Sequence, residues 1–226
     1  MKCSARVHFL LIAALVVTSR LCIAQQERAE FTIEGLQLVE DSNLALVYAQ
    51  PGIDLGRYDR ILLDEPYIAF KKNWQRNQKR FHDGWITTDD MTKIKMELSS
   101  LFMDVFSQTL EEGGYELVLD TGEDVLLIRP AIINLDVVAP DTNSPGIKRT
   151  YSETAGEMTL YMELYDSVSG ELLAKALDRK EDRRTGYFEW QNRVTNRAAA
   201  NRILRVWAKV LKEGLDDARG ASPGKP

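Results

Sequence analysis

Adjacent acidic residues are the first candidates for chemistry in this chain of 226 residues. Two carboxyl groups that face each other can hydrolyse a glycosidic bond without a histidine. The candidates are Asp64-Glu65, Asp89-Asp90 and Glu123-Asp124. Each has a simpler interpretation: the second suits the first turn of a helix, the third suits a turn, and only one residue of the first can face inward from a strand. We therefore predict a protein that is not an enzyme, with a carboxylate-dependent hydrolase of envelope glycan as the alternative.

Histidine and cysteine chemistry is restricted, because the chain has only two residues of each type. Cys3, Cys22 and the first histidine lie in an N-terminal segment that we expect to be removed. His82 alone cannot build a zinc site with several histidines, and no cysteine remains for it to activate. The sequence also lacks a Gly-rich phosphate loop and the His-Glu-x-x-His and Gly-x-Ser-x-Gly motifs. We predict no catalytic residue, no bound metal and no cofactor.

Residues 71–86 are the strongest candidate for binding, because they concentrate positive charge and aromatic rings in an acidic chain. The candidate residues are Lys71, Lys72, Trp74, Arg76, Lys79, Arg80 and Trp85. Lysine and arginine can hold phosphate or carboxylate groups, and tryptophan offers a surface for stacking. A lipid headgroup, a cell-wall polymer or an acidic envelope protein would suit this chemistry. The alternative is a solvated loop whose aromatic side chains fold back on the core. A second basic cluster, at residues 179–184, is largely neutralised by its own acids.

The N-terminus has the pattern of a secretory signal peptide. Lys2 and Arg6 form a positively charged region, an apolar run follows, and small residues precede a cleavage site between Ala24 and Gln25. The apolar run is shorter than the roughly 20 residues of a membrane-spanning helix, so we expect no transmembrane segment in the mature chain. The pattern predicts an exported protein, periplasmic or secreted.

Cys22 leaves a second interpretation open, because bacterial lipoproteins are cut directly before the cysteine that carries the lipid. The preceding residues, Ser19-Arg20-Leu21, fit that signal poorly, with an arginine in the recognition stretch and a bulky leucine beside the cut. Soluble export is the prediction, and an outer-membrane lipoprotein anchored through Cys22 is the alternative. Cleavage after Ala24 leaves 26 basic against 34 acidic residues, which argues against nucleic-acid binding.

The spacing of apolar residues indicates several strands and two long helices. We expect strands at residues 61–70, 115–119, 125–138, 157–165 and 172–177, the last two joined as a hairpin. A helix is expected to begin at Thr88 and end at Gly113-Gly114, and another to begin near Thr195. The helices do not alternate with the strands one for one. We therefore predict an α+β fold, with a mixed or antiparallel sheet of about five to six strands and two amphipathic helices packed on one face.

The chain is expected to form a single domain, because no stretch resembles a linker. The predicted organisation is a signal peptide at 1–24, a flexible N-terminal segment at 25–43, the domain at 44–218 and a disordered tail at 219–226. The Gly- and Pro-containing composition of the last residues is typical of such a tail.

Three stretches carry a family resemblance. They are Val47-Tyr48-Ala49-Gln50-Pro51-Gly52 with Tyr58-Asp59-Arg60-Ile61-Leu62-Leu63-Asp64, then Leu126-Leu127-Ile128-Arg129-Pro130-Ala131-Ile132, then residues 163–174 with the helix at Trp207-Ala208 behind them. Together they resemble the bacterial domain-of-unknown-function family 3313, over roughly residues 44–218. These motifs are turn and strand patterns, not catalytic signatures. The resemblance implies an exported envelope protein, with many lipoproteins among its relatives and no agreed activity.

Overall fold

The computed structural model describes residues 30–78, 86–137, 150–152, 154–183, 189–191 and 193–221. The strands are β1 (Gln37–Leu38), β2 (Leu46–Ala49), β3 (Arg60–Leu63), β4 (Tyr67–Phe70), β5 (Glu116–Leu117), β6 (Val125–Val137), β7 (Thr150–Ser152), β8 (Thr154–Asp166), β9 (Leu172–Arg183) and β10 (Glu189–Gln191). The helices are α1 (Trp74–Gln78), α2 (Thr88–Glu112) and α3 (Arg193–Ala221), with a 3-10 turn η1 (Leu55–Arg57). The predicted signal peptide, with Cys22 and the cleavage site at Ala24 and Gln25, lies outside the described residues.

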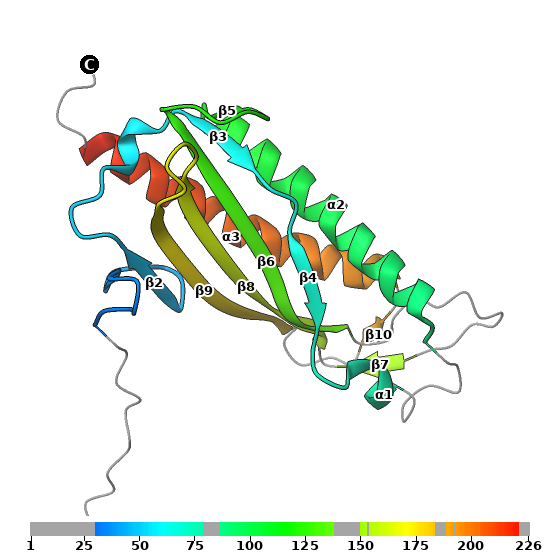
Figure 1. Cartoon of the computed structure of the whole chain (residues 1–226). Helices are drawn as coiled ribbons and strands as arrows, with labels where there is room; N and C mark the ends of the chain where they lie inside the picture. The colour runs from blue at the N-terminus through cyan, green and yellow to red at the C-terminus, as the bar shows by residue number, and fades with distance from the viewer. Residues whose placement is uncertain are drawn as a thin grey trace, which may run out of the picture.

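A mixed sheet of eight strands forms the centre of the described chain. Its order is β1-β2-β9-β8-β6-β3-β5, with β4 also paired to β6, and β10 and β7 form a separate two-stranded sheet. The long strands β6, β8 and β9 pair antiparallel with one another, whereas β3 and β4 run parallel to β6. Helices α2 and α3 lie together on one face of the large sheet (Figure 1). The predicted α+β fold with two helices on one face is confirmed. The sheet has eight strands where five to six were predicted, because β1 and β2 add to it and the strand expected over residues 61–70 is divided in two.

The strand expected over residues 61–70 is two strands, β3 and β4, which pair one after the other with β6. The ladder is interrupted between Leu63 and Tyr67, opposite Arg129 and Pro130. Pro66 also falls in this interruption, and a proline has no N–H to donate to a ladder. The two prolines on facing segments therefore account for the break.

Helix α2 begins with a capping box that holds its acids in place. The cap is Thr87, one residue before the predicted start. The Asp90 N–H donates to the Thr87 hydroxyl at 3.1 Å, and the Asp90 carboxylate accepts from the Thr87 N–H at 2.9 Å. This reciprocal pair satisfies donors that a helix start leaves without partners. At the other end the chain turns at Gly113, the predicted cap.

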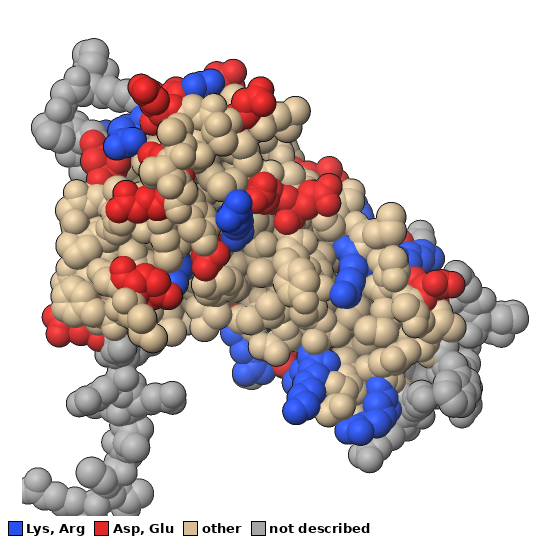
Figure 2. All heavy atoms as spheres, in the orientation of Figure 1, with Lys and Arg blue, Asp and Glu red and all other residues tan. Residues whose placement is uncertain are grey.

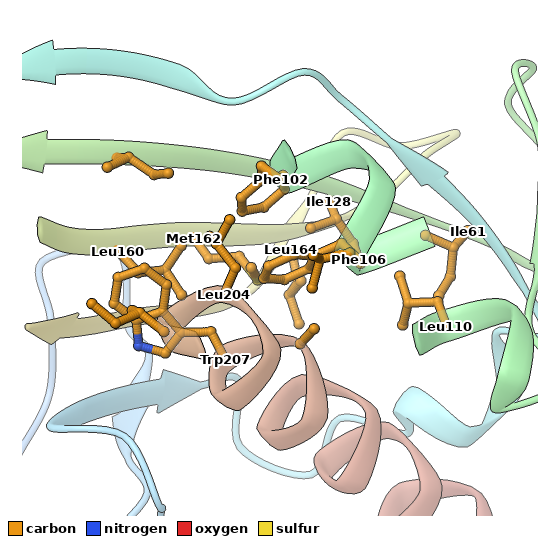
Figure 3. Close-up of a cluster of buried hydrophobic side chains, with 14 of the residues drawn as sticks. Ile61, Phe102, Phe106, Leu110, Ile128, Leu160, Met162, Leu164, Leu204 and Trp207 are labelled. Atoms are coloured by element: carbon orange, nitrogen blue, oxygen red, sulfur yellow. The ribbon is translucent and has the colours of Figure 1, made fainter. Parts of the chain in front are cut away.

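The core lies between the large sheet and the two helices (Figure 3). Phe102 and Phe106 of α2 are fully buried, with their rings stacked at a centroid distance of 3.9 Å. Trp207 of α3 is also buried, and its indole N–H donates to the buried Asp178 carboxylate at 2.8 Å. These three rings are thus packed in the core, and the indole N–H of Trp207, their one polar group, has a hydrogen-bond partner.

The N-terminal segment is more ordered than predicted. Residues 30–38 form a hairpin, which we call the N-terminal hairpin, closed by hydrogen bonds such as Leu38 N–H to the Glu30 carbonyl at 2.9 Å. Leu36 is 1% exposed, and Glu34 forms an ion pair with Lys175 at 2.9 Å. One buried apolar side chain and one ion pair therefore fix a segment that polar composition had suggested to be loose. At the other terminus, α3 runs to Ala221, three residues into the predicted tail.

The face of the sheet opposite α2 and α3 carries a cluster of tyrosines around one acid. The Tyr161 and Tyr165 hydroxyls both donate to the Glu163 carboxylate, at 2.6 and 2.7 Å. Burial and this acid raise the pKa of both tyrosines, which keeps them protonated as donors. Arg129 and Lys175 flank Glu163 on the neighbouring strands, so the charges on this face alternate.

Candidate binding site at the basic end of the sheet

The two basic clusters of the sequence meet at one end of the large sheet, which we call the basic end. Lys71 directly follows β4, and Arg179 lies on β9. The Glu157 carboxylate on β8 joins them, because it accepts from Lys71 Nζ at 2.7 Å and from the Arg179 guanidinium. Lys71 also contacts Asp136 on β6 at 3.2 Å. Basic side chains gather around this end, near α1 and the ends of β8 and β9, and acids predominate toward the opposite end (Figure 2).

The charges of this network stabilise one another. Glu157 and then Asp136 raise the pKa of Lys71, while Lys71 and then Arg179 hold the pKa of Glu157 below its usual range. Lys71 and Glu157 therefore stay charged near neutral pH, and the two cations of the network offset its two acids. The surplus positive charge of the basic end must come from other side chains.

A cavity opens beside this network, between the N-terminal halves of α2 and α3, and we call it the helix cavity. Its volume is about 110 Å³, within a hollow of about 820 Å³ that is partly open to solvent. Its apolar lining consists of Ile94, Leu98, Leu101, Leu135, Val137, Met158, Ala199, Ala200 and Ile203. Asp136 and Glu157 also line it, so the ion network is continuous with its wall.

Gly156 shapes the floor of the helix cavity. Its φ of +142° is one that side-chain-bearing residues rarely adopt, and a Cβ atom there would lie 2.4 Å from the Asp136 carbonyl oxygen. A larger residue would therefore force β6 and β8 apart where they line the cavity.

The rim of the helix cavity carries two cations and one acid. Lys93 and Glu97 are half-buried on α2, and Arg197 is exposed on α3. Within the part of the chain that the structure describes, none of the three forms an ion pair. Lys71 and Arg179 balance the other two acids of the lining, Asp136 and Glu157, so Lys93 and Arg197 against Glu97 leave an excess of one positive charge.

The predicted binding residues separate into different environments. Trp74 is 2% exposed, stacks on Phe70 at a centroid distance of 4.2 Å, and donates its N–H to the Val137 carbonyl at 3.3 Å. Its ring therefore packs inward and offers no open surface for stacking. Lys72 and Arg76 are exposed and form no ion pair with any described residue. The structure does not bring Trp74 to the surface beside them. Lys79, Arg80 and Trp85, with His82, lie outside the described residues.

The acidic pairs considered for hydrolysis each have structural contacts. Asp64 forms an ion pair with Arg129 at 3.1 Å, and Asp124 forms one with Arg60. Asp90 belongs to the capping box of α2. In the described ranges, no group of three or more histidine, cysteine, aspartate or glutamate side chains is arranged to hold a metal ion.

Sequence reasoning did not identify the residues that line the cavity. Ile94, Leu98 and Ile203 belong to the apolar spacing that predicts the two helices, but periodicity cannot show that the helices leave a gap. Lys93 and Arg197 stand among many charged helix residues. Gly156 was the one local signal for the cavity, because a glycine within a strand often marks a place where another part of the backbone approaches closely.

The family of the chain follows from its sequence match over residues 33–211. These residues fit the model of a family described as protein of unknown function, DUF3313. The chain belongs to this family. Among curated proteins no significant match was found.

Several solved structures resemble the chain weakly. They include the PelC dodecamer from Paraburkholderia phytofirmans, at 12% identity over 74% of this chain and 96% of that chain, with a TM-score of 0.37. Protein XCC0632 from Xanthomonas campestris, described as DUF330, is 10% identical over 71% of this chain and 88% of that chain, with a TM-score of 0.40. A DUF4136 family protein from Bacteroides thetaiotaomicron is 11% identical over 78% of this chain and 97% of that chain, with a TM-score of 0.33. In the described part of this chain, no helix combines the length and apolar character needed to cross a bilayer.

Proposed function

We propose that this DUF3313 protein is an exported, non-enzymatic binding module. It docks an acidic partner protein by accepting one apolar side chain of that partner in the helix cavity. The observation that carries the proposal is an apolar cavity between two helices whose rim, Lys93 and Arg197 against Glu97, has an excess of positive charge. The signal-peptide pattern supports export.

The size of the cavity favours a side chain over a whole lipid chain. An apolar cavity of about 150 Å³ is known to bind benzene. The helix cavity, at about 110 Å³, is somewhat smaller and matches one large side chain. Anchor residues of protein interfaces fill pockets of this kind, and polar contacts at the rim then supply orientation and specificity.

Charge at the basic end favours acids beside that anchor. Lys72 and Arg76 are exposed nearby, and together with Lys93 and Arg197 they would meet acids that flank the anchor. Each exposed pair contributes less than about 1 kcal/mol, so the charges mainly select the partner and speed its association.

Binding of short labelled peptides tests this function by fluorescence anisotropy at low salt. The peptide Glu-Glu-Phe-Glu-Glu should bind, whereas Glu-Glu-Ser-Glu-Glu and Lys-Lys-Phe-Lys-Lys should not. Replacing Lys93 and Arg197 by serine should weaken binding, and replacing Lys209, which is exposed elsewhere on α3, should not. Equal binding of the phenylalanine and serine peptides would refute the anchor. Binding of neutral or anionic lipid vesicles, with no peptide binding, would assign the site to lipid instead.

Export and anchoring are tested separately by mass spectrometry of the mature N-terminus in cells. The proposal predicts a chain that begins at Gln25. A lipid-carrying Cys22 at the N-terminus would identify an anchored lipoprotein, and an uncut Met1 would refute export.

A further inference from the structure

The N-terminal hairpin presents apolar side chains to solvent on a rigid turn. Ile33 is fully exposed at the tip, and Phe31 is 52% exposed beside it. The turn is closed by the Gly35 N–H, which donates to the Thr32 carbonyl at 3.0 Å. Leu36 is buried beneath the hairpin, so its position is fixed. Two exposed apolar residues held in this way form a preorganised contact, because little conformational entropy remains to be lost on binding.

The charges around this tip complement the basic end. Glu30 and Glu34 flank the two apolar residues, and both are exposed. Lys175 shares the Glu34 carboxylate and holds the pKa of Glu34 at about 2, so this acid stays charged. Lys175 offsets the charge of Glu34, so Glu30 gives the tip its net negative charge. The hairpin therefore has the chemistry expected of a ligand for the helix cavity: an apolar anchor beside an acid.

The hairpin and the helix cavity lie on opposite faces of the large sheet in one molecule. Glu34 contacts Lys175, which pairs with Glu163 on the face away from the helices. The cavity lies on the helix side, where its floor is Met158. Figure 1 shows the hairpin at the β2 edge, remote from the N-terminal ends of α2 and α3. The tip thus cannot enter the cavity of its own chain.

We propose that the N-terminal hairpin of one copy docks in the helix cavity of a second copy, with the fully exposed Ile33 as the anchor. This inference rests on the proposed function, since it names the partner of the same cavity. The two surfaces are different, so two copies can exchange hairpins reciprocally and close as a dimer. Where they do not, each contact leaves a free hairpin and a free cavity, and the assembly continues to a closed ring or an open chain.

Sedimentation velocity of the chain from Gln25 onward, over rising concentration, tests the inference. The wild type should form dimers or larger species at several hundred micromolar. Ile33→Asp and Ala200→Trp, which fills the cavity, should each stay monomeric. Val168→Asp, on an exposed turn residue elsewhere, should behave like the wild type. Circular dichroism and thermal unfolding confirm that each variant is folded.

Mixing two variants gives a result that misfolding cannot imitate. Ile33→Asp keeps its cavity and Ala200→Trp keeps its hairpin, so an equal mixture should form a one-to-one dimer and nothing larger. A wild type that stays monomeric, or an Ile33→Asp variant that assembles normally, would overturn the inference. If the Glu-Glu-Phe-Glu-Glu peptide still binds in that case, the proposed function stands and only its partner is wrong.

Discussion

Replacing Asp166 by asparagine should remove a large share of the stability of the turn between β8 and β9. Asp166 is 7% exposed. Its Oδ1 accepts from the backbone N–H groups of Val168 and Ser169, at 3.1 and 2.8 Å. Its Oδ2 accepts from the Tyr58 hydroxyl at 2.9 Å and from Arg57 at 3.0 Å. Asparagine keeps one oxygen but presents an NH₂ group to two donors, which leaves those donors without an acceptor.

The expected cost follows from the pKa of Asp166. The backbone N–H of Ser169 and the other donors lower this pKa from 3.8 to about 2. One pKa unit corresponds to about 1.4 kcal/mol, so the carboxylate contributes about 2 kcal/mol to the free energy of unfolding at neutral pH. Because the folded state has the lower pKa, this contribution is complete above about pH 5 and is lost as the pH falls toward 2.

Urea unfolding at neutral pH and near pH 3 measures this difference. Asp166→Asn should be less stable than the wild type by about 2 kcal/mol at pH 7, and the gap should narrow at the lower pH. Asp41→Asn is the matched control, because Asp41 is exposed and has no hydrogen bond or ion pair with a described residue. A difference in the free energy of unfolding that is the same at both pH values, or absent at pH 7, would refute the reasoning.

Three further changes test other parts of the structure by urea unfolding. Gly156→Ala should lower the free energy of unfolding by roughly 1–3 kcal/mol, because of its positive φ and its close approach to the Asp136 carbonyl oxygen. Gly214→Ala, in the interior of α3, should be neutral or stabilising by up to about 1 kcal/mol. Equal effects of the two changes would refute the strain at Gly156. Trp207→Phe should lower the free energy of unfolding by about 1–3 kcal/mol, because the buried Asp178 carboxylate loses one hydrogen-bond donor. An unchanged free energy of unfolding would show that this hydrogen bond does not stabilise the fold. Lys71→Ser should cost up to about 1 kcal/mol through its two ion pairs, and Lys72→Ser nothing measurable; the reverse order would contradict the network.

The sequence was sufficient for the main elements of the fold because they are long and periodic. The apolar face of α2 and the alternation in β8 each extend over several turns or residue pairs, so chance cannot easily produce them. The two-residue strand β1 leaves no such pattern, and its pairing with β2 depends on a partner that lies outside its own residues. Leu36 shows the same limit, since one apolar residue in a polar segment does not reveal what will cover it.

Whether segment 71–86 binds a ligand stays a prediction, and its sequence could not show the direction of each side chain. The basic residues of segment 71–86 do mark one end of the sheet, as the position of Lys71, Lys72 and Arg76 shows. Trp74 was grouped with them by neighbourhood in sequence, but one turn of helix directs it into the core. The joining of Lys71 to Arg179 through Glu157 depends on strand order, which no local pattern contains.

A methyl-selective NMR titration with the Glu-Glu-Phe-Glu-Glu peptide tests the central claim most directly. The claim is that an apolar side chain enters the cavity between α2 and α3. The methyl signals of Ile94, Met158 and Ile203 should shift, while those of Ile61 at the far end and Leu177 on the outer face should not. Shifts centred on Leu177 or Ile61, or no shift at saturating peptide, would contradict the account.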